Sequence, residues 1–285
     1  INELFKAPSV IVWKKHLDGD MSELIWAPEI HYIDKKWYIY FAAAPNKEVT
    51  GITFNHRMYV IECLDADPLT GTWTEKGQIK TGWESFSLDA TILQHKGKLY
   101  YIWAQEDRNV NYESHSNIYI AEMENPWTLR TKPVMLTQPL LDWEIKIFWV
   151  NEGPAILKKN GKIFLTYSAS ATDENYCMGM LVVNENDDLL DPKSWKKLEK
   201  PVFKTSYKNK QYGPGHNSFT VSEDGMKDLL VYHARNYTDI EGDPLYDPNR
   251  HTRVQVIEWD KDGFPIFGEP VMDTRNVDFD SLRKK

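Results

Sequence analysis

Residues 87–103 read SLDATILQHKGKLYYIW, and this stretch decides the fold because the chain repeats its pattern. A strand begins after a short polar segment, a Lys96-Gly97 turn follows, and a second apolar and aromatic strand completes the hairpin. The other copies are WAPEIHYIDKKWYIYF (26–41), NEGPAILKKNGKIFLTY (151–167) and a weaker GHNSFTVSEDGMKDLLVY (215–232). The copies align at Ile30, Ile92, Ile156 and Phe219, at intervals of 62, 64 and 63 residues. Repeats of this length predict the blades of a β-propeller.

The remainder of each repeat also predicts strands. Asn160-Gly161 and Asp224-Gly225 separate paired apolar runs, and such dipeptides form tight hairpin turns because both positions tolerate positive φ. A third apolar run follows each hairpin, and we expect these outer strands at residues 58–63, 118–123, 178–183 and 254–259. The chain has no linker and no low-complexity stretch, so residues 1–285 are expected to form one all-β domain.

The repeat also predicts an incomplete blade. One period before Ile30 falls ahead of residue 1, and residues 6–14 (KAPSVIVWK) have the pattern of the last strand of a blade. We therefore expect a five-bladed β-propeller of which most of the first blade, its N-terminal part, is missing from this chain. A complete four-bladed propeller is the alternative.

The composition argues against several classes of partner. The 34 basic and 42 acidic side chains give a net charge of −8, whereas nucleic-acid binding favours a basic patch. No run of 18 apolar residues could cross a membrane, and the first residues do not form a signal peptide. Cys63 and Cys177 are too few for a disulfide framework, which favours the cytoplasm slightly without excluding secretion. The 11 Trp, 15 Tyr and 11 Phe suit a protein that stacks aromatic rings on sugars.

Two carboxylates stand where the innermost strands begin. Asp89 and Glu152 open these strands in neighbouring repeats, and blades converge on an axis, so both are expected to project into one axial pocket. Glycoside hydrolysis needs two carboxyl groups, one protonated to donate to the leaving oxygen and one ionised. Gly153-Pro154 directly after Glu152 fixes the backbone and leaves room for a ligand. The alternative for each acid is a structural one that caps a turn.

Four motifs in this chain resemble glycoside hydrolase family 43, most closely its exo-acting α-L-arabinofuranosidases. They are WAPE (26–29), SLDAT (87–91), NEGPA (151–155) and GPGHNS (213–218), and the similarity runs from about residue 7 to residue 270. The resemblance implies a five-bladed propeller and an inverting mechanism with three acids. It makes Glu152 the general acid and Asp89 the residue that orients this acid and raises its pKa, as one carboxylate near another does.

The family's third acid has no counterpart here. Its general base is an Asp in the first blade, in an Ala-Asp-Pro type of motif, and no such residue precedes Trp26. The similar Asp65-Ala66-Asp67-Pro68 follows an outer strand, so we expect it to lie far from the axis. The base is therefore expected in the missing N-terminal segment.

Six further residues are candidates for binding. The resemblance implies that His216 lies on the axis near a central ion, often calcium, which would be coordinated largely by water because calcium prefers six to eight oxygens; a core histidine is the alternative. Trp26, Trp149 and Phe86 are candidate walls for the sugar, or they pack between blades. Glu29 contacts the ligand or faces the blade interface. Arg253, expected to begin the last inner strand, matches a family Arg near the pocket.

The sequence thus favours an inverting exo-α-L-arabinofuranosidase that releases L-arabinose from arabinan or arabino-oligosaccharides. A β-xylosidase or another glycosidase of the same family, including an endo-acting one, is the first alternative, because loops rather than the fold select the substrate. A non-catalytic carbohydrate-binding propeller is the second, because the chain lacks the base. No nucleic-acid or membrane partner is expected.

Overall fold

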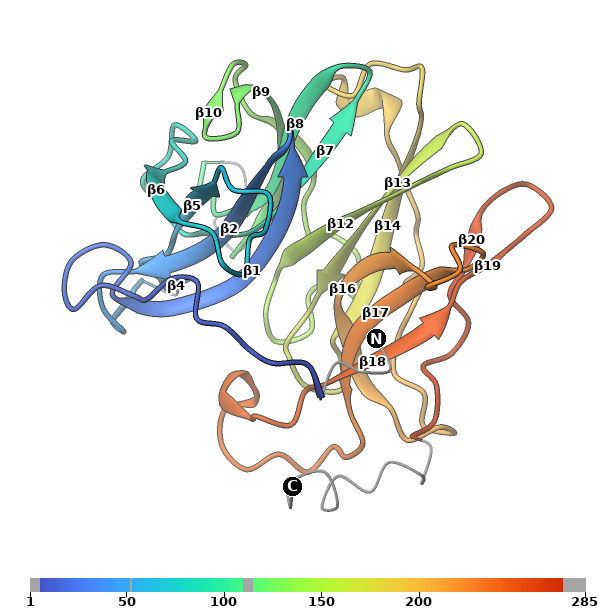
Figure 1. Ribbon diagram of the computed structural model, residues 1–285. Helices are drawn as coiled ribbons and strands as arrows, with labels where there is room; N and C mark the ends of the chain where they lie inside the picture. The colour runs from blue at the N-terminus through green and yellow to red at the C-terminus, as the bar shows by residue number, and fades with distance from the viewer. Residues whose placement is uncertain (1–5, 52, 110–114, 274–285) are drawn as a thin grey trace. The chain divides into compact units, whose positions relative to one another are not determined.

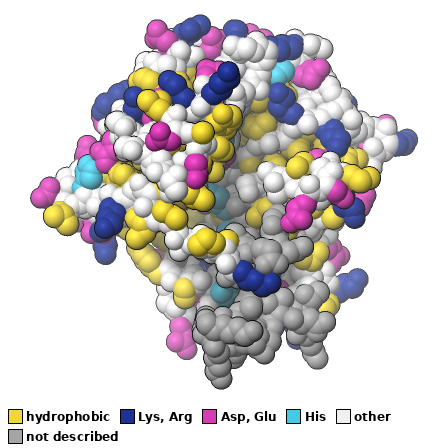
Figure 2. Space-filling model, in the orientation of Figure 1, with side chains coloured by type: hydrophobic (Ala, Val, Ile, Leu, Met, Phe, Trp, Pro, Cys, Tyr) yellow, Lys and Arg dark blue, Asp and Glu magenta, His cyan; other side chains and the backbone are white. Residues whose placement is uncertain are grey.

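The computed structural model describes residues 6–51, 53–109 and 115–273, and strands dominate it (Figure 1). The chain divides into two compact units, Ile1–Leu136 and Thr137–Lys285. Each unit contains two antiparallel sheets of the blade type, so the described residues confirm an all-β propeller with four blades. No helix among these residues is long and apolar enough to cross a membrane. Basic and acidic side chains are interspersed on the face shown in Figure 2.

The first unit contains the sheets that begin with the first two repeats. Its first sheet has the order β1 (Glu23–Ile33), β2 (Lys36–Ala44), β5 (Arg57–Cys63), β6 (Trp73–Gln78). Its second sheet consists of β7 (Ser87–His95), β8 (Lys98–Gln105), β9 (Asn117–Asn125) and β10 (Thr128–Leu129), and β11 (Val134–Thr137) also pairs with β9. A separate small hairpin joins β3 (Val49–Thr50) and β4 (Thr53–Phe54).

The second unit repeats this arrangement. Its sheets are β12 (Asn151–Lys159), β13 (Lys162–Ala169), β14 (Cys177–Asn184), β15 (Lys196–Lys197), and then β16 (Tyr212–Val221), β17 (Asp228–Arg235), β18 (His251–Val256). The short strands β19 (Glu258–Trp259) and β20 (Pro265–Ile266) pair with each other. Two short 3₁₀ helices, η2 (Pro192–Ser194) and η3 (Pro244–Tyr246), lie in loops. Apolar side chains of both sheets, including Phe164, Met178 and Leu230, form one buried cluster, and burial of each contributes about 2 kcal/mol.

The predicted hairpins form, but at Asp224-Gly225 only the glycine has positive φ, and a longer loop joins β16 to β17 because their pairing ends at Val221 and Asp228. Lys96-Gly97 and Asn160-Gly161 have positive φ at both positions, as two-residue turns of this kind require. The outer strands expected at 58–63, 118–123 and 178–183 lie within β5, β9 and β14, whereas the one expected at 254–259 is divided, because β18 ends at Val256 and Glu258–Trp259 form the separate strand β19. Cys63 and Cys177 are buried free thiols.

Each innermost strand carries an irregularity that the sequence did not reveal. The pairing register slips between Trp26 and Glu29 in β1, and at the corresponding places in β7, β12 and β16. A residue with left-handed φ stands at each slip, namely Ala27, Asp89, Gly153 and His216 (φ 45°, 51°, 55° and 43°). These are β-bulges, which concentrate beside active sites because they redirect side chains. The bulge therefore belongs to the repeat and marks the start of every inner strand.

Two expectations about strands are wrong. Residues 6–14 form no strand; Val10 and Ile11 are exposed, and Trp13 instead packs on Phe41 with ring centroids 4.9 Å apart. An apolar run becomes a strand only where it finds a partner, and this one pairs with none among the described residues. Arg253 does not begin an inner strand, because β18 is the third strand of its sheet and pairs with β17. The rejected Asp65 and Asp67 indeed lie in the turn between β5 and β6, where they accept backbone hydrogen bonds.

A buried carboxylate fixes the loop that leads into β12. Glu144 is fully buried and accepts hydrogen bonds from the Tyr167 hydroxyl (2.8 Å), the Asn151 amide (3.2 Å) and the backbone N–H groups of Leu140 and Leu141 (both 2.9 Å). Lys197 Nζ, on β15, lies 2.7 Å from the same carboxylate. Since Asn151 is the first residue of β12, this network determines where that strand begins.

Removing the cation of this network should destabilise the protein. Lys197→Met would leave the Glu144 carboxylate buried without its counter-ion, and we expect a loss of about 3 kcal/mol in the free energy of unfolding, measured in urea. Lys98→Met is the matched control, because the Lys98 side chain is half exposed and Glu122 keeps Arg130 as a second partner. Equal small effects in both variants would contradict this role of Glu144.

Candidate active site

The first candidate residue, Asp89, sits at the bulge of β7 in the first unit. Its side chain is buried, with 5% exposed, and its φ is +51°. Left-handed backbone is uncommon outside glycine, although Asp tolerates it, and it concentrates at functional sites. The bulge separates Asp89 from the regular alternation of β7, because Leu88 and Ala90 pair with adjacent residues of β8. A carboxylate is therefore placed by the backbone at the position where β1 has only Ala27.

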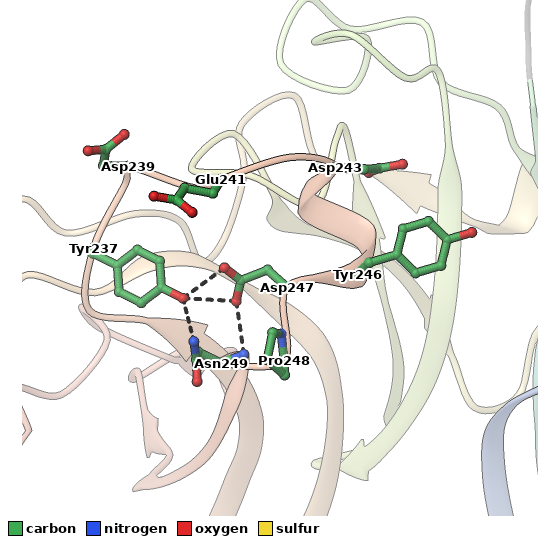
Figure 3. Close-up of a pocket in the computed structure, with 8 residues that line it drawn as sticks. All are labelled: Tyr237, Asp239, Glu241, Asp243, Tyr246, Asp247, Pro248 and Asn249. Atoms are coloured by element: carbon green, nitrogen blue, oxygen red, sulfur yellow. Dashed lines mark hydrogen bonds between the residues drawn. The ribbon is translucent and has the colours of Figure 1, made fainter.

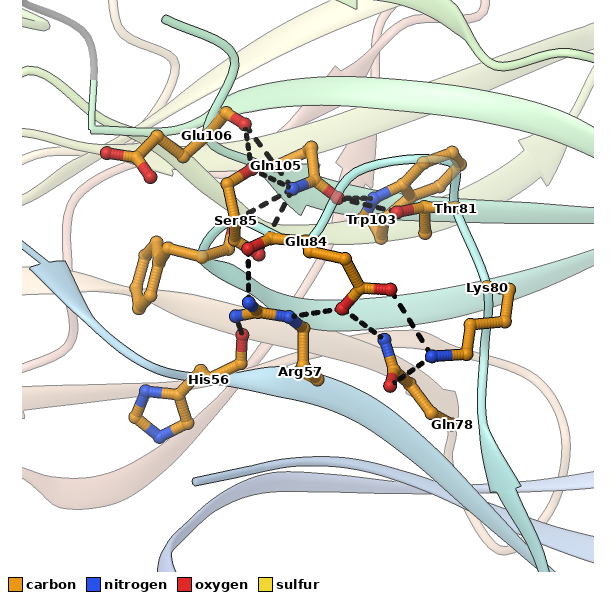
Figure 4. A network of polar contacts seen from close by, with 11 residues as sticks. His56, Arg57, Gln78, Lys80, Thr81, Glu84, Ser85, Trp103, Gln105 and Glu106 are labelled. Atoms are coloured by element: carbon orange, nitrogen blue, oxygen red, sulfur yellow. Dashed lines mark hydrogen bonds and ion pairs between the residues drawn. The ribbon is translucent and has the colours of Figure 1, made fainter. Parts of the chain in front are cut away.

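A polar network holds the segment before β7 (Figure 4). The buried Gln105 amide, at the end of β8, donates to Ser85 Oγ (2.9 Å) and to the Phe86 carbonyl (3.0 Å). Its oxygen accepts from Thr81 (3.1 Å) and from the Trp103 indole (3.0 Å). Arg57 at the start of β5 bonds the Glu84 side chain and backbone. The chain segment that leads to Asp89 is thus held in place by residues of β8 and β5.

Trp26 and Phe86 meet around one histidine. The ring of His56 lies 4.2 Å from that of Trp26 and 5.7 Å from that of Phe86, and Phe54 contacts both Trp26 and His56. His56 is fully buried, and its Nε2–H donates to the Leu24 carbonyl (2.9 Å). Burial lowers the pKa of His56 to about 4, against the opposing effect of that hydrogen bond. The cluster therefore contains a neutral imidazole at neutral pH.

This histidine makes the protein acid-sensitive. The pKa of His56 is lower in the folded state than in the unfolded state. The contribution of neutral His56 to the free energy of unfolding is therefore complete above pH 6.5 and is lost as the pH falls towards 4. Between pH 7.5 and 4.5 the loss should be about 2–3 kcal/mol, and His56→Gln should abolish that part of the pH dependence in urea unfolding. In the control His16→Gln the loss should persist, because a hydrogen bond to Glu75 raises the pKa of the exposed His16. An unchanged slope in His56→Gln would refute the assignment.

Glu29 lies at the interface between the two sheets of the first unit. Its Oε1 accepts from Thr91 Oγ1 of β7 (2.7 Å) and lies 3.0 Å from His31 Nε2. Thr91 is two residues beyond Asp89, so Glu29 joins β1 to the strand that carries the candidate acid. A role in ligand binding remains a prediction for Glu29, as it does for Trp26 and Phe86.

The second candidate acid, Glu152, is held by a tyrosine in the second unit. Tyr176 Oη donates to Glu152 Oε1 over 2.7 Å. Glu152 precedes the bulge residue Gly153, and a Cβ on Gly153 would lie 3.4 Å from the ring of His216, the bulge residue of the neighbouring strand β16. The backbone N–H of His216 in turn donates to Ser168 Oγ (2.8 Å), and Ser168 pairs with Glu152. The structure thus brings Glu152, Tyr176 and His216 together.

The residues around His216 do not form a metal site on their own. Within the described ranges, no group of three or more His, Cys, Asp and Glu side chains could hold a metal ion. A calcium ion prefers six to eight oxygen ligands, and a single imidazole supplies none. No step below depends on a metal.

Trp149 and Arg253 have different surroundings. Trp149 is half buried in the loop before β12, after the exposed Ile147 and Phe148. Arg253 is occupied by the protein itself, because its guanidinium donates to the carbonyls of Ala234 and His251 and lies 3.1 Å from the Asp273 carboxylate. Substrate binding stays a prediction for both, and these contacts weaken it for Arg253.

The loop between β17 and β18 encloses an acidic pocket of about 510 Å³ (Figure 3). Its centre is Asp247, whose carboxylate oxygens lie 2.9 and 2.8 Å from the Tyr237 hydroxyl and whose Oδ1 lies 3.3 Å from Arg235 Nε. Although burial acts in the opposite direction, hydrogen bonds from Asn249, Tyr237 and Arg235 lower the pKa of Asp247. None of the candidate site residues lines this pocket. The hydrogen bonds of Asp247 indicate that this pocket is a structural part of the loop.

Comparisons with known proteins agree with these features. The chain belongs to glycosyl hydrolases family 43, whose pattern it matches over residues 1–265. It is 56% identical over 95% of its length to an extracellular exo-α-(1→5)-L-arabinofuranosidase of Streptomyces avermitilis, and 50% identical over 96% to α-L-arabinofuranosidase 43 of Humicola insolens. It spans 55% and 56% of these two relatives.

A solved structure is also similar. The crystal structure of an α-L-arabinofuranosidase from Lactobacillus brevis superposes with a TM-score of 0.94 and 62% sequence identity. The similarity covers 96% of this chain and 85% of that one. The family and the propeller class predicted from the repeated motifs are therefore confirmed.

Sequence reasoning missed two members of the site. Tyr176 follows a polar loop and carries no motif, and His56 stands in an ordinary polar stretch before β5. The only available signal was for His56, since a histidine between Phe54 and a strand of buried residues is a candidate for burial.

Proposed function

We propose that the protein is an inverting exo-α-L-arabinofuranosidase that releases L-arabinose from α-(1→5)-linked arabinan or arabino-oligosaccharides. The observation that supports this most strongly is the 56% identity, over nearly the whole chain, to a relative with this named activity. The carboxylates Asp89 and Glu152, which lie at or beside inner-strand bulges, are the candidates for two of the three acids of this mechanism, the general acid and the residue that orients it.

The proposed mechanism is a single displacement. Glu152, as the general acid, gives its proton to the glycosidic oxygen while the bond from that oxygen to the anomeric carbon breaks. A water molecule adds to the anomeric carbon and loses its proton to a general base, which inverts the configuration. The family resemblance assigns to Asp89 the role of orienting the general acid and keeping it protonated.

The base and the fifth blade belong to the same proposal. Members of this family are five-bladed, and by resemblance the base is an Asp of the first blade. We propose both for the active enzyme on the ground of the family resemblance alone; no residue before Trp26 in this sequence has the required motif. An Asp→Asn variant of that first-blade residue in the full-length protein should lack activity.

Other sugars define the alternatives. The same scaffold serves a β-xylosidase or another glycosidase of the family, and a non-catalytic sugar-binding propeller is the candidate from a different class. Initial rates on 4-nitrophenyl α-L-arabinofuranoside and 4-nitrophenyl β-D-xylopyranoside separate these possibilities, because a binding module hydrolyses neither.

Glu152→Gln should abolish most of the activity of the full-length protein. Loss of a general acid costs about 10²–10⁴-fold in kcat, and we expect this loss in the release of arabinose from α-(1→5)-arabinobiose. Glu258→Gln, which changes an exposed carboxylate on β19, serves as the control. Full activity of Glu152→Gln would overturn the assignment of the acid.

The water-coordinated calcium ion at His216 stays a prediction. If the ion is present, EDTA should lower the Tm of the full-length protein, CaCl₂ should restore it, and His216→Ala should remove the response. An unchanged Tm in EDTA would show that the histidine has a purely structural role.

A further inference from the structure

Tyr176 contacts the candidate acid from a position that packing fixes tightly. It lies one residue before β14, its side chain is buried with 1% exposed, and its hydroxyl donates to Glu152 Oε1 over 2.7 Å. Glu152 is on β12, and β13 separates β12 from β14 in the sheet. The ring therefore reaches past one strand to meet the carboxylate.

The neighbouring sheet leaves space for this ring. A Cβ on Gly215 of β16 would lie 2.5 Å from Tyr176 Cε1, so only glycine fits there. A Cβ on Gly213, whose φ is +60°, would lie 2.2 Å from the Asp173 carbonyl oxygen in the loop that carries Tyr176. Gly213 and Gly215 of the GPGHNS motif thus leave room for Tyr176 and its loop. This packing explains the two glycines, whereas the candidate acids do not explain them.

A histidine also packs against the ring of Tyr176. His233 of β17 stacks on Tyr176 with centroids 5.4 Å apart and an interplanar angle of 16°. Neither of its buried ring nitrogens has a hydrogen-bond partner among the described residues. Burial lowers the pKa of His233 well below its ordinary value, and the positive charges of Arg250, Arg235 and Arg253 lower it further. His233 is therefore a neutral, flat support that fixes the tilt of the phenol.

We propose that Tyr176 is a positioning residue that gives the two oxygens of Glu152 different roles. Oε1 accepts the hydrogen bond of the phenol, and Oε2 carries the proton that is transferred. This inference rests on the proposed role of Glu152 as the general acid. In a neutral carboxyl group the carbonyl oxygen is the better acceptor, so a donor at Oε1 places the proton on Oε2.

The same hydrogen bond also assists the reaction. As the proton leaves Oε2 for the glycosidic oxygen, Glu152 becomes a carboxylate, and the bond from Tyr176 becomes charge-assisted and stronger. An interaction that strengthens towards the transition state raises kcat rather than ground-state binding. Atoms balance as in the proposed mechanism, since the phenol keeps its own proton throughout.

The test compares Tyr176→Phe with the unchanged full-length protein on two substrates. On α-(1→5)-arabinobiose, whose leaving alcohol needs protonation, we expect kcat to fall at least about tenfold with KM nearly unchanged. On 4-nitrophenyl α-L-arabinofuranoside, whose leaving group departs as a stable anion, the fall should be much smaller. The alkaline limb of the pH profile should move to higher pH, because the carboxylate of Glu152 has lost a donor.

The controls separate this inference from the proposed function. Tyr232→Phe removes another buried hydroxyl of the second unit, bonded to Gln255 (2.9 Å), and should alter neither the substrate ratio nor the pH limb. The titratable neighbours His216 and His233 are present in every variant. If Glu152→Gln is inactive on arabinobiose but Tyr176→Phe shows equal losses on both substrates and an unmoved limb, Tyr176 is merely structural. If Glu152→Gln is fully active, the proposed function itself fails, and this inference fails with it.

Discussion

A left-handed residue at the start of every innermost strand is the constraint on which the candidate site depends. Ala27, Asp89, Gly153 and His216 occupy this place, and each interrupts the pairing of its strand with the next one. Because side chains alternate along a strand, one extra residue redirects the side chains that precede it relative to those that follow. The repeated bulge thus gives every sheet a position where a functional group can be placed without disturbing the hairpin behind it.

Glu144, which is fully buried, and Glu152, which is partly buried, have different hydrogen-bond partners in the second unit. Glu144 accepts hydrogen bonds from two side chains and two backbone groups and pairs with Lys197, so its charge is fully compensated. Glu152 is held at Oε1 by the phenol of Tyr176, a neutral donor. Glu144 thus holds the loop before β12, whereas the contact of Glu152 with Tyr176 links the start of β12 to the loop before β14.

The first unit places its acid by a different means. A neutral network around Gln105, together with Arg57, holds the segment before Asp89, and the neutral imidazole of His56 fills the aromatic cluster of Trp26 and Phe86. Buried polar groups of this kind specify one arrangement because an unmade hydrogen bond in the interior is costly. Hydrogen bonds thus hold the segment before Asp89 in the first unit and the start of β12 in the second unit, where two glycines also leave room for the ring of Tyr176 and its loop.

The sequence by itself determined the repeat, the hairpins and the first three outer strands, because periodic apolar runs and turn dipeptides are local features, and the motifs around Asp89 and Glu152 made these two residues candidate acids. It predicted a strand at residues 6–14 that does not form, and it placed Arg253 on an inner strand although β18 is the third of its sheet. A local pattern cannot show whether a segment finds a pairing partner. Only the tertiary structure decided which residues serve the acids, since Tyr176 lies 24 residues after Glu152 and meets it only when β12, β13 and β14 pair.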